Sequence, residues 1–421
     1  MTSTLASAYL HLERQVRHWI LAGERLSALE DLAAPEAWQS LESYLGLAIR
    51  ESLNASLAAL RQEGKMLERS LSGQPGQEVL PLLVKATDRY RKQYLRTETV
   101  LDFYADAINT RTNPRMASLM RACDYICRQA MTTILDPLGQ ETPPVLTYID
   151  KGLGASILKA GLRLWDRKTE NPAAVIKVVR HNVFRPTSLV HESGHQVAYM
   201  LGWNEELRAE LRGALQAESE ELAEAWASWA SEIAADVFGF VHTGYASVAS
   251  LHDVVSGNHR WVFRYTPGDP HPISYLRVLL GVAFCKRSFG AGPWDQLAKL
   301  WMQKHPISQA DADLRPLLRE SLKVLPKIAR LCLEKPLQSF GGKSLISWIP
   351  PEQVSPGSLQ ALQQKIGHDA GRHARYAPQY PLQLLGLSGL NIAITPRKSR
   401  NLVLLQESWM KALGNMPLQL V

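Results

Sequence analysis

Apolar positions recur three and four residues apart from residue 1 to about residue 140, as in "LASAYLHLERQVRHWIL" and "PLLVKATDRYRKQYLRTETVLDFYADAI". That spacing is the period of an amphipathic helix, so residues 1–142 are predicted to form a helical N-terminal domain. Glycine and proline in "SLSGQPGQEVLP", residues 70–81, interrupt the helical period and divide this domain into two halves.

The pattern then changes to short runs rich in β-branched residues. "PPVLTYIDKGLG", residues 143–154, and "PAAVIKVVRH", residues 172–181, are bounded by proline, glycine and asparagine. Runs of this kind are typical of strands, and they predict a small β-sheet. The second strand could present an edge to which an extended peptide adds.

A helix is expected directly after the second strand. Pro186 would stop the strand, Thr187 or Ser188 would cap the helix, and Gly202 would end it. The charged and alanine-rich stretch over 204–240 predicts one or two further helices.

The remaining sequence predicts a long loop over 251–275, where glycine, asparagine and proline are dense, and helices beyond it. The tail contains one strand candidate, "LNIAIT" at 390–395, and a last helix at 401–413. The predicted fold class is therefore mainly α with a small β-sheet (α+β).

Composition narrows the class of protein. Of the 421 residues, 46% are apolar and 21% charged, as in an ordinary globular chain. No run approaches the roughly 20 apolar residues of a membrane span, and the N-terminus is too charged for a secretory signal, so we expect a cytoplasmic protein. The net charge of +7 is scattered, which gives no strong signal for nucleic acid. The four cysteines have no metal-site spacing, and buried thiols are expected.

The segment "SLVHESGHQVAYML", residues 188–201, carries candidate chemistry. On a helix, His191 and His195 lie one turn apart on the same face, so both rings can converge on one metal ion. Glu192 lies about 100° around the helix, close enough to reach a water bound to that ion. Val190 and Val197 belong to an apolar stripe beside the histidines, which indicates a buried helix.

A third ligand has to come from a later segment, and "WASWASEIAADVFGF", residues 226–240, offers one. Glu232 and Asp236 are four residues apart in an otherwise apolar helix, where a carboxylate needs a partner. Glu232 is the candidate third ligand, and Asp236 is placed to accept a hydrogen bond from a ligand histidine. A structural ion pair is the alternative for Glu232, and local capping or pairing is the alternative for Asp236.

These residues resemble the gluzincin metallopeptidases, which combine HExxH with a downstream ExxxD helix. The resemblance implies that His191, His195 and Glu232 hold one Zn²⁺ per chain, that Glu192 is the general base, and that Asp236 supports His191.

Two related classes are excluded by single positions or by spacing. The metzincin continuation would need glycine at 198 and histidine at 201, where this chain has Ala198 and Leu201. Thirty-six residues separate His195 from Glu232, more than the short interval of the thermolysin branch.

A second motif, "HPISYLR", gives His271, Pro272 and Arg277. It is similar to the HPxxxxR element of the membrane-bound gluzincins, which helps shape their active site, although their membrane-spanning helices are absent here. The resemblance implies that His271 and Arg277 help shape the active site, and both are candidate catalytic residues. The tetrahedral oxyanion needs a donor besides the metal, which we expect to be His271 or Arg277, with Tyr265 and Tyr275 as further candidates.

The expected function is a zinc-dependent endopeptidase that cleaves specific protein or peptide substrates through a metal-activated water and a glutamate base. A zincin-like metallopeptidase domain would occupy residues 143–305, followed by a mostly helical C-terminal region at 306–421. The N-terminal helices are a candidate surface for a protein partner. Two alternatives stay open: a non-catalytic adaptor that contains structural zinc, and a metal-dependent amidase acting on a small molecule.

Overall fold

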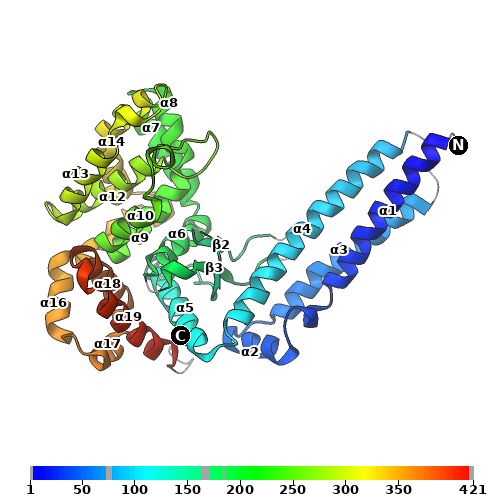
Figure 1. The fold of residues 1–421 in the computed structure, drawn as a ribbon, viewed down its shortest axis with the longest axis horizontal. Coiled ribbons are helices and arrows are strands. Elements are labelled where there is room, and N and C mark those ends of the chain that lie inside the picture. The colour runs from blue at the N-terminus through cyan, green and yellow to red at the C-terminus, as the bar shows by residue number, and fades with distance from the viewer. Residues whose placement is uncertain (1–2, 73–77, 153, 164–169, 184, 417–421) are drawn as a thin grey trace. The chain divides into compact units, whose positions relative to one another are not determined.

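The computed structural model describes residues 3–72, 78–152, 154–163, 170–183 and 185–416. These residues form many helices and one three-stranded sheet, so the predicted fold class, mainly α with a small sheet, is confirmed (Figure 1). The α-helices are α1 (Ser3–Leu26), α2 (Pro35–Leu45), α3 (Ile49–Ser72), α4 (Leu80–Thr110), α5 (Pro114–Leu135), α6 (Thr187–Leu201), α7 (Trp203–Leu215), α8 (Glu220–Ser228), α9 (Ala230–Thr243), α10 (Tyr245–Val255), α11 (His259–Val262), α12 (Ser274–Phe289), α13 (Pro293–Lys304), α14 (Arg315–Glu334), α15 (Leu345–Trp348), α16 (Pro356–Ile366), α17 (Ala370–Tyr376), α18 (Pro381–Ile394) and α19 (Ser399–Gly414). The strands are β1 (Val145–Asp150), β2 (Ser156–Leu158) and β3 (Ala174–Val179).

Packing divides the chain into two compact units. The first comprises residues 1–112 with 158–175, and the second comprises residues 113–157 with 176–421. This division follows contacts in space, whereas the predicted domains at 1–142, 143–305 and 306–421 follow changes in the sequence pattern. Helix α5, within the predicted N-terminal domain, packs against α6, and α14 packs against α12, so both belong to the unit with the candidate site.

The first unit is built on three long helices, α1, α3 and α4, which pack against one another. Tyr90 of α4 is buried between the other two helices. Gly23 of α1 and Gly64 of α3 leave room for its hydroxyl group, since a side-chain carbon at these positions would lie 2.7 and 2.9 Å from the hydroxyl oxygen. The predicted break is present, since α3 ends at Ser72 and α4 begins at Leu80. Residues 73–77 of that break lie outside the described residues.

The sheet has the strand order β1–β3–β2. The two predicted strand runs are confirmed by β1 and β3. Because β3 lies between β1 and β2, it is not an edge strand, and the expectation that a peptide adds to this strand as an edge is wrong. The edges belong to β1 and β2.

Helix α6 carries the two motif histidines and packs closely on α9. It ends as predicted at Gly202, whose φ of 66° is left-handed and whose N–H donates to the Ala198 carbonyl. The predicted cap is wrong, because Pro186 occupies the N-cap position and makes no side-chain cap. At Gly194, a side-chain carbon would lie 2.9 Å from both Ala235 Cα and Phe238 Cβ. Glycine at this position therefore permits the close approach of α6 and α9.

Three further expectations change in the structure. "LNIAIT" is part of helix α18 and its following residue, so the strand prediction there is wrong. A short apolar run does not distinguish a buried helix from a strand, and α18 is buried along most of its length. The predicted loop at 251–275 contains the end of α10 and the short helix α11, and 204–240 contains three helices rather than one or two.

A search of the described helices finds none with the length and apolar character needed to cross a bilayer.

Candidate metal centre

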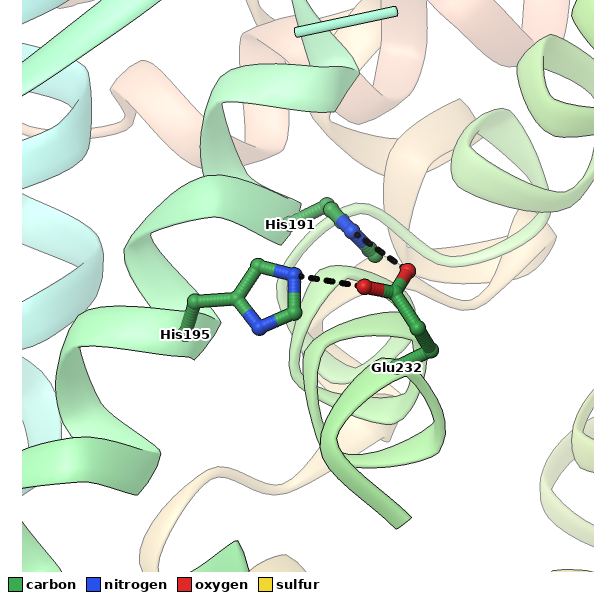
Figure 2. Close-up of side chains that lie close together, drawn as sticks. All are labelled: His191, His195 and Glu232. Carbon is green, nitrogen blue, oxygen red and sulfur yellow. Dashed lines mark ion pairs between the residues drawn. The ribbon is translucent and has the colours of Figure 1, made fainter. Parts of the chain in front are cut away.

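His191 and His195 project from one face of α6 toward Glu232 on α9 (Figure 2). The His191 Nε2 atom lies 3.5 Å from Glu232 Oε2, and the His195 Nε2 atom lies 3.2 Å from Glu232 Oε1. One ligand atom from each of the three residues lies within 4.8 Å of the others. This group can hold a metal ion, as the motif spacing predicts.

The donor set and its spacing fit zinc. Two imidazole nitrogens and one carboxylate oxygen are the protein ligands of a common class of catalytic zinc sites. Two ligand atoms bound at about 2.1 Å in tetrahedral geometry are about 3.4 Å apart. The two nitrogen–oxygen separations of 3.5 and 3.2 Å are close to this value.

Asp236 is hydrogen-bonded to the other ring nitrogen of His191. His191 Nδ1 lies 2.9 Å from Asp236 Oδ1, so the imidazole donates there and keeps Nε2 turned toward Glu232. Burial disfavours a charged imidazole, but the hydrogen bonds to Asp236 and Glu232 outweigh it and raise the pKa of His191 to about 10. A metal ion has to displace this proton, so binding releases protons. The Nδ1 atom of His195 has a different neighbour, the Ser231 hydroxyl at 3.3 Å.

Arg277, on α12, pairs with both carboxylates. Its Nε donates to Asp236 Oδ2 at 2.6 Å, and its Nη2 donates to Asp236 Oδ1 at 2.8 Å and to Glu232 Oε2 at 3.0 Å. Burial alone would raise the pKa of Glu232, but the histidine hydrogen bonds and the Arg277 charge hold it well below the usual value. Through these contacts Arg277 holds both carboxylates in place, and the oxyanion role that the sequence indicated for it stays a prediction.

Replacing Arg277 with methionine is expected to destabilise the metal-free protein by about 3–5 kcal/mol, because two buried carboxylates lose their counter-charge. The free energy of unfolding from urea titration in chelator measures this. The exposed Arg319→Met change on α14 serves as the control. An unchanged midpoint in the Arg277 variant would show that the ion pairs contribute nothing.

Replacing Asp236 with asparagine is expected to weaken zinc binding by about 10–100-fold, because the neutral amide orients and polarises His191 less well. Competition with a zinc-chelating dye gives the affinity. Asp295→Asn is the matched control, since Asp295 pairs with Lys286 on the surface. Equal affinities for the two variants would rule out this role of Asp236.

His271 lies at the exposed side of the centre. Its Nδ1 is 2.6 Å from Asp269 Oδ1, and its Nε2 is 3.7 Å from Glu232 Oε1. With 57% of its side chain exposed, His271 turns its Nε2 toward the candidate ligands, where it is accessible to a substrate. Since Nδ1 donates to Asp269, Nε2 is a donor only in the doubly protonated ring. Tyr265 and Tyr275, the further candidates, do not line the cavity described next, and Tyr275 is buried against Phe263.

A cavity of about 480 Å³ opens beside the candidate metal centre, where His191 and Glu232 line it and His195 does not, and it lies entirely within the second unit. Glu192 lines it and is only 6% exposed, and burial raises the pKa of its carboxyl group against the opposing effect of the two histidines. The sequence carried no signal for the opposite wall, which is made by α10 and the segment after it, including Val248, Leu251, Trp261 and Arg264.

Comparison with protein-family models, curated proteins and solved structures found no match to this chain.

Proposed function

We propose that this protein is a zinc-dependent endopeptidase of the gluzincin type, with His191, His195 and Glu232 as the zinc ligands. The observation that carries the proposal is the convergence of these three side chains from two helices beside a cavity that His191, Glu232 and Glu192 line. A cytoplasmic location and the binding of a protein partner by the N-terminal helices remain predictions from the sequence.

The chemistry follows from the positions of the side chains. A zinc ion bound at this centre supplies a Lewis acid that polarises the substrate carbonyl and lowers the pKa of water toward 7. Glu192 accepts the proton of the attacking water and returns it to the leaving amine. His271 donates from Nε2 to the developing oxyanion as an imidazolium whose Nδ1–H is held by Asp269, and Arg277 with Asp236 keeps Glu232 and His191 in place.

The adaptor alternative is less well supported by the same residues. A structural zinc site is closed by four protein ligands, whereas three donors meet here among the described residues. A buried carboxylate beside such a site, as at Glu192, has no role in a purely structural centre.

The deciding experiment incubates the zinc-loaded protein with peptides from a digested proteome and identifies new termini by mass spectrometry. New termini that vanish with 1,10-phenanthroline and return with added Zn²⁺ support an endopeptidase. Hydrolysis of small N-acyl amides without peptide cleavage would favour the amidase. Stoichiometric zinc with no hydrolysis of either would favour the adaptor.

A further inference from the structure

Gly239 is a glycine in the interior of α9 that the packing of the protein does not require. Glycine at an interior helical position is less stable than alanine. Among the described residues outside its own helix, a side-chain carbon at 239 would meet nothing nearer than 3.8 Å, where it would touch the His191 backbone. This is ordinary contact, in contrast to Gly194, where the nearest atoms would be 2.9 Å away.

The space that an alanine methyl group would occupy at 239 belongs to the cavity, which Gly239 lines. Gly239 lies three residues beyond Asp236 on α9, directly beside His191. It therefore stands between the polar end of the cavity, which contains the metal ligands, and the part of the cavity deeper along α9.

That deeper part is apolar. Val248, Leu251 and Val255 line it from one face of α10, since they are spaced three and four residues apart. Phe240 and Phe284 also line it, and their ring centres are 5.5 Å apart. From Glu232 to Phe240 the cavity follows α9 for eight residues, or about 12 Å. We name this part, lined by these five residues, the apolar lobe.

We propose that Gly239 is a specificity-determining residue: its missing side chain opens the passage from the metal centre to the apolar lobe, and the lobe binds a large apolar side chain next to the scissile bond. This inference rests on the proposed peptidase function. Transfer of an apolar side chain from water into such a lobe is favourable and strengthens binding, whereas a glycine at the same substrate position has no side chain to transfer.

The test measures binding without turnover, with three hydroxamic acids that share one zinc-chelating group. Acetohydroxamic acid has no side chain, 3-phenylpropionohydroxamic acid carries one aromatic ring, and dodecanohydroxamic acid carries a long acyl chain. Titration calorimetry on the zinc-loaded protein is expected to give a Kd for the phenyl probe at least about tenfold below that of acetohydroxamic acid.

Gly239→Ala is expected to reduce this ratio of Kd values to about two or less, at unchanged zinc content. Gly213→Ala is the matched control, because Gly213 is an exposed helical glycine on α7 that does not line the cavity. Leu251→Trp fills the lobe from its half-buried α10 wall and should have the same effect, whereas Leu322→Trp, at a half-buried position on α14 outside the cavity, should not.

The outcomes distinguish failure of the proposed peptidase function from failure of this inference alone. A protein that binds no zinc overturns the proposed function, and this inference with it. Bound zinc with equal affinity for the acetyl and phenyl probes overturns the inference alone. So does a ratio of the two Kd values that stays unchanged in both Gly239→Ala and Leu251→Trp. A dodecanoyl probe that binds more than tenfold tighter than the phenyl probe also overturns it, because the occupant would then be an acyl chain.

Discussion

The Glu192→Gln variant is expected to keep one zinc ion per chain and to lose peptide hydrolysis by a factor of about 10²–10⁴, the usual contribution of a general base. Glutamine preserves the size of the side chain, but its neutral amide does not accept the proton of the attacking water. Glu192 lines the cavity beside the ligands and is not itself one of the three converging donors, so its replacement leaves the ligand set complete.

The measurement pairs zinc analysis of the purified protein with the rate at which peptide termini appear. Glu221→Gln is the control, since Glu221 is an exposed glutamate on α8. Cleavage that survives in the Glu192 variant at full zinc occupancy would refute the mechanism. Loss of zinc together with loss of cleavage would instead assign Glu192 to the coordination of the ion.

The Glu232→Ala variant is expected to bind zinc at least about 100-fold more weakly and to lose peptide hydrolysis with it. Loss of a hydrogen-bonding partner of a ligand typically costs 10–100-fold in affinity, and loss of the ligand itself should cost more. Glu232 is the only carboxylate of the converging group in the described part of the chain, and it bridges both histidines at 3.5 and 3.2 Å.

Competition with a zinc-chelating dye measures this affinity, and His181→Ala provides a control at an exposed histidine near α6. Retained zinc affinity in the Glu232 variant would show that the carboxylate serves only as the partner of Arg277, with which it forms a 3.0 Å hydrogen bond. The structural ion pair that the sequence left open for Glu232 would then be its whole role.

Residues close together in the chain were predictable because helical geometry is local. A rise of four residues returns a side chain to the same face, so the pairs His191/His195 and Glu232/Asp236 were placed on common faces from spacing alone. The fold class, the strands β1 and β3 and the end of α6 at Gly202 follow from equally short patterns. The strand prediction for "LNIAIT" was wrong because a local pattern does not report burial, and the burial of α18 depends on distant helices.

Tertiary packing determines that the candidate ligands meet at one centre. No local pattern requires α6 to pack on α9, because 36 residues separate His195 from Glu232. The absence of a side chain at Gly194 permits the two helices to approach closely. The guanidinium of Arg277 meets the carboxylates from a third helix, and three helices, α9, α10 and α12, supply the residues of the apolar lobe without any sequence motif. Sequence alone determined which atoms could bind a metal and on which helical faces they lie. Only the folded chain decided that they meet, because packing between distant helices depends on the shapes of whole surfaces.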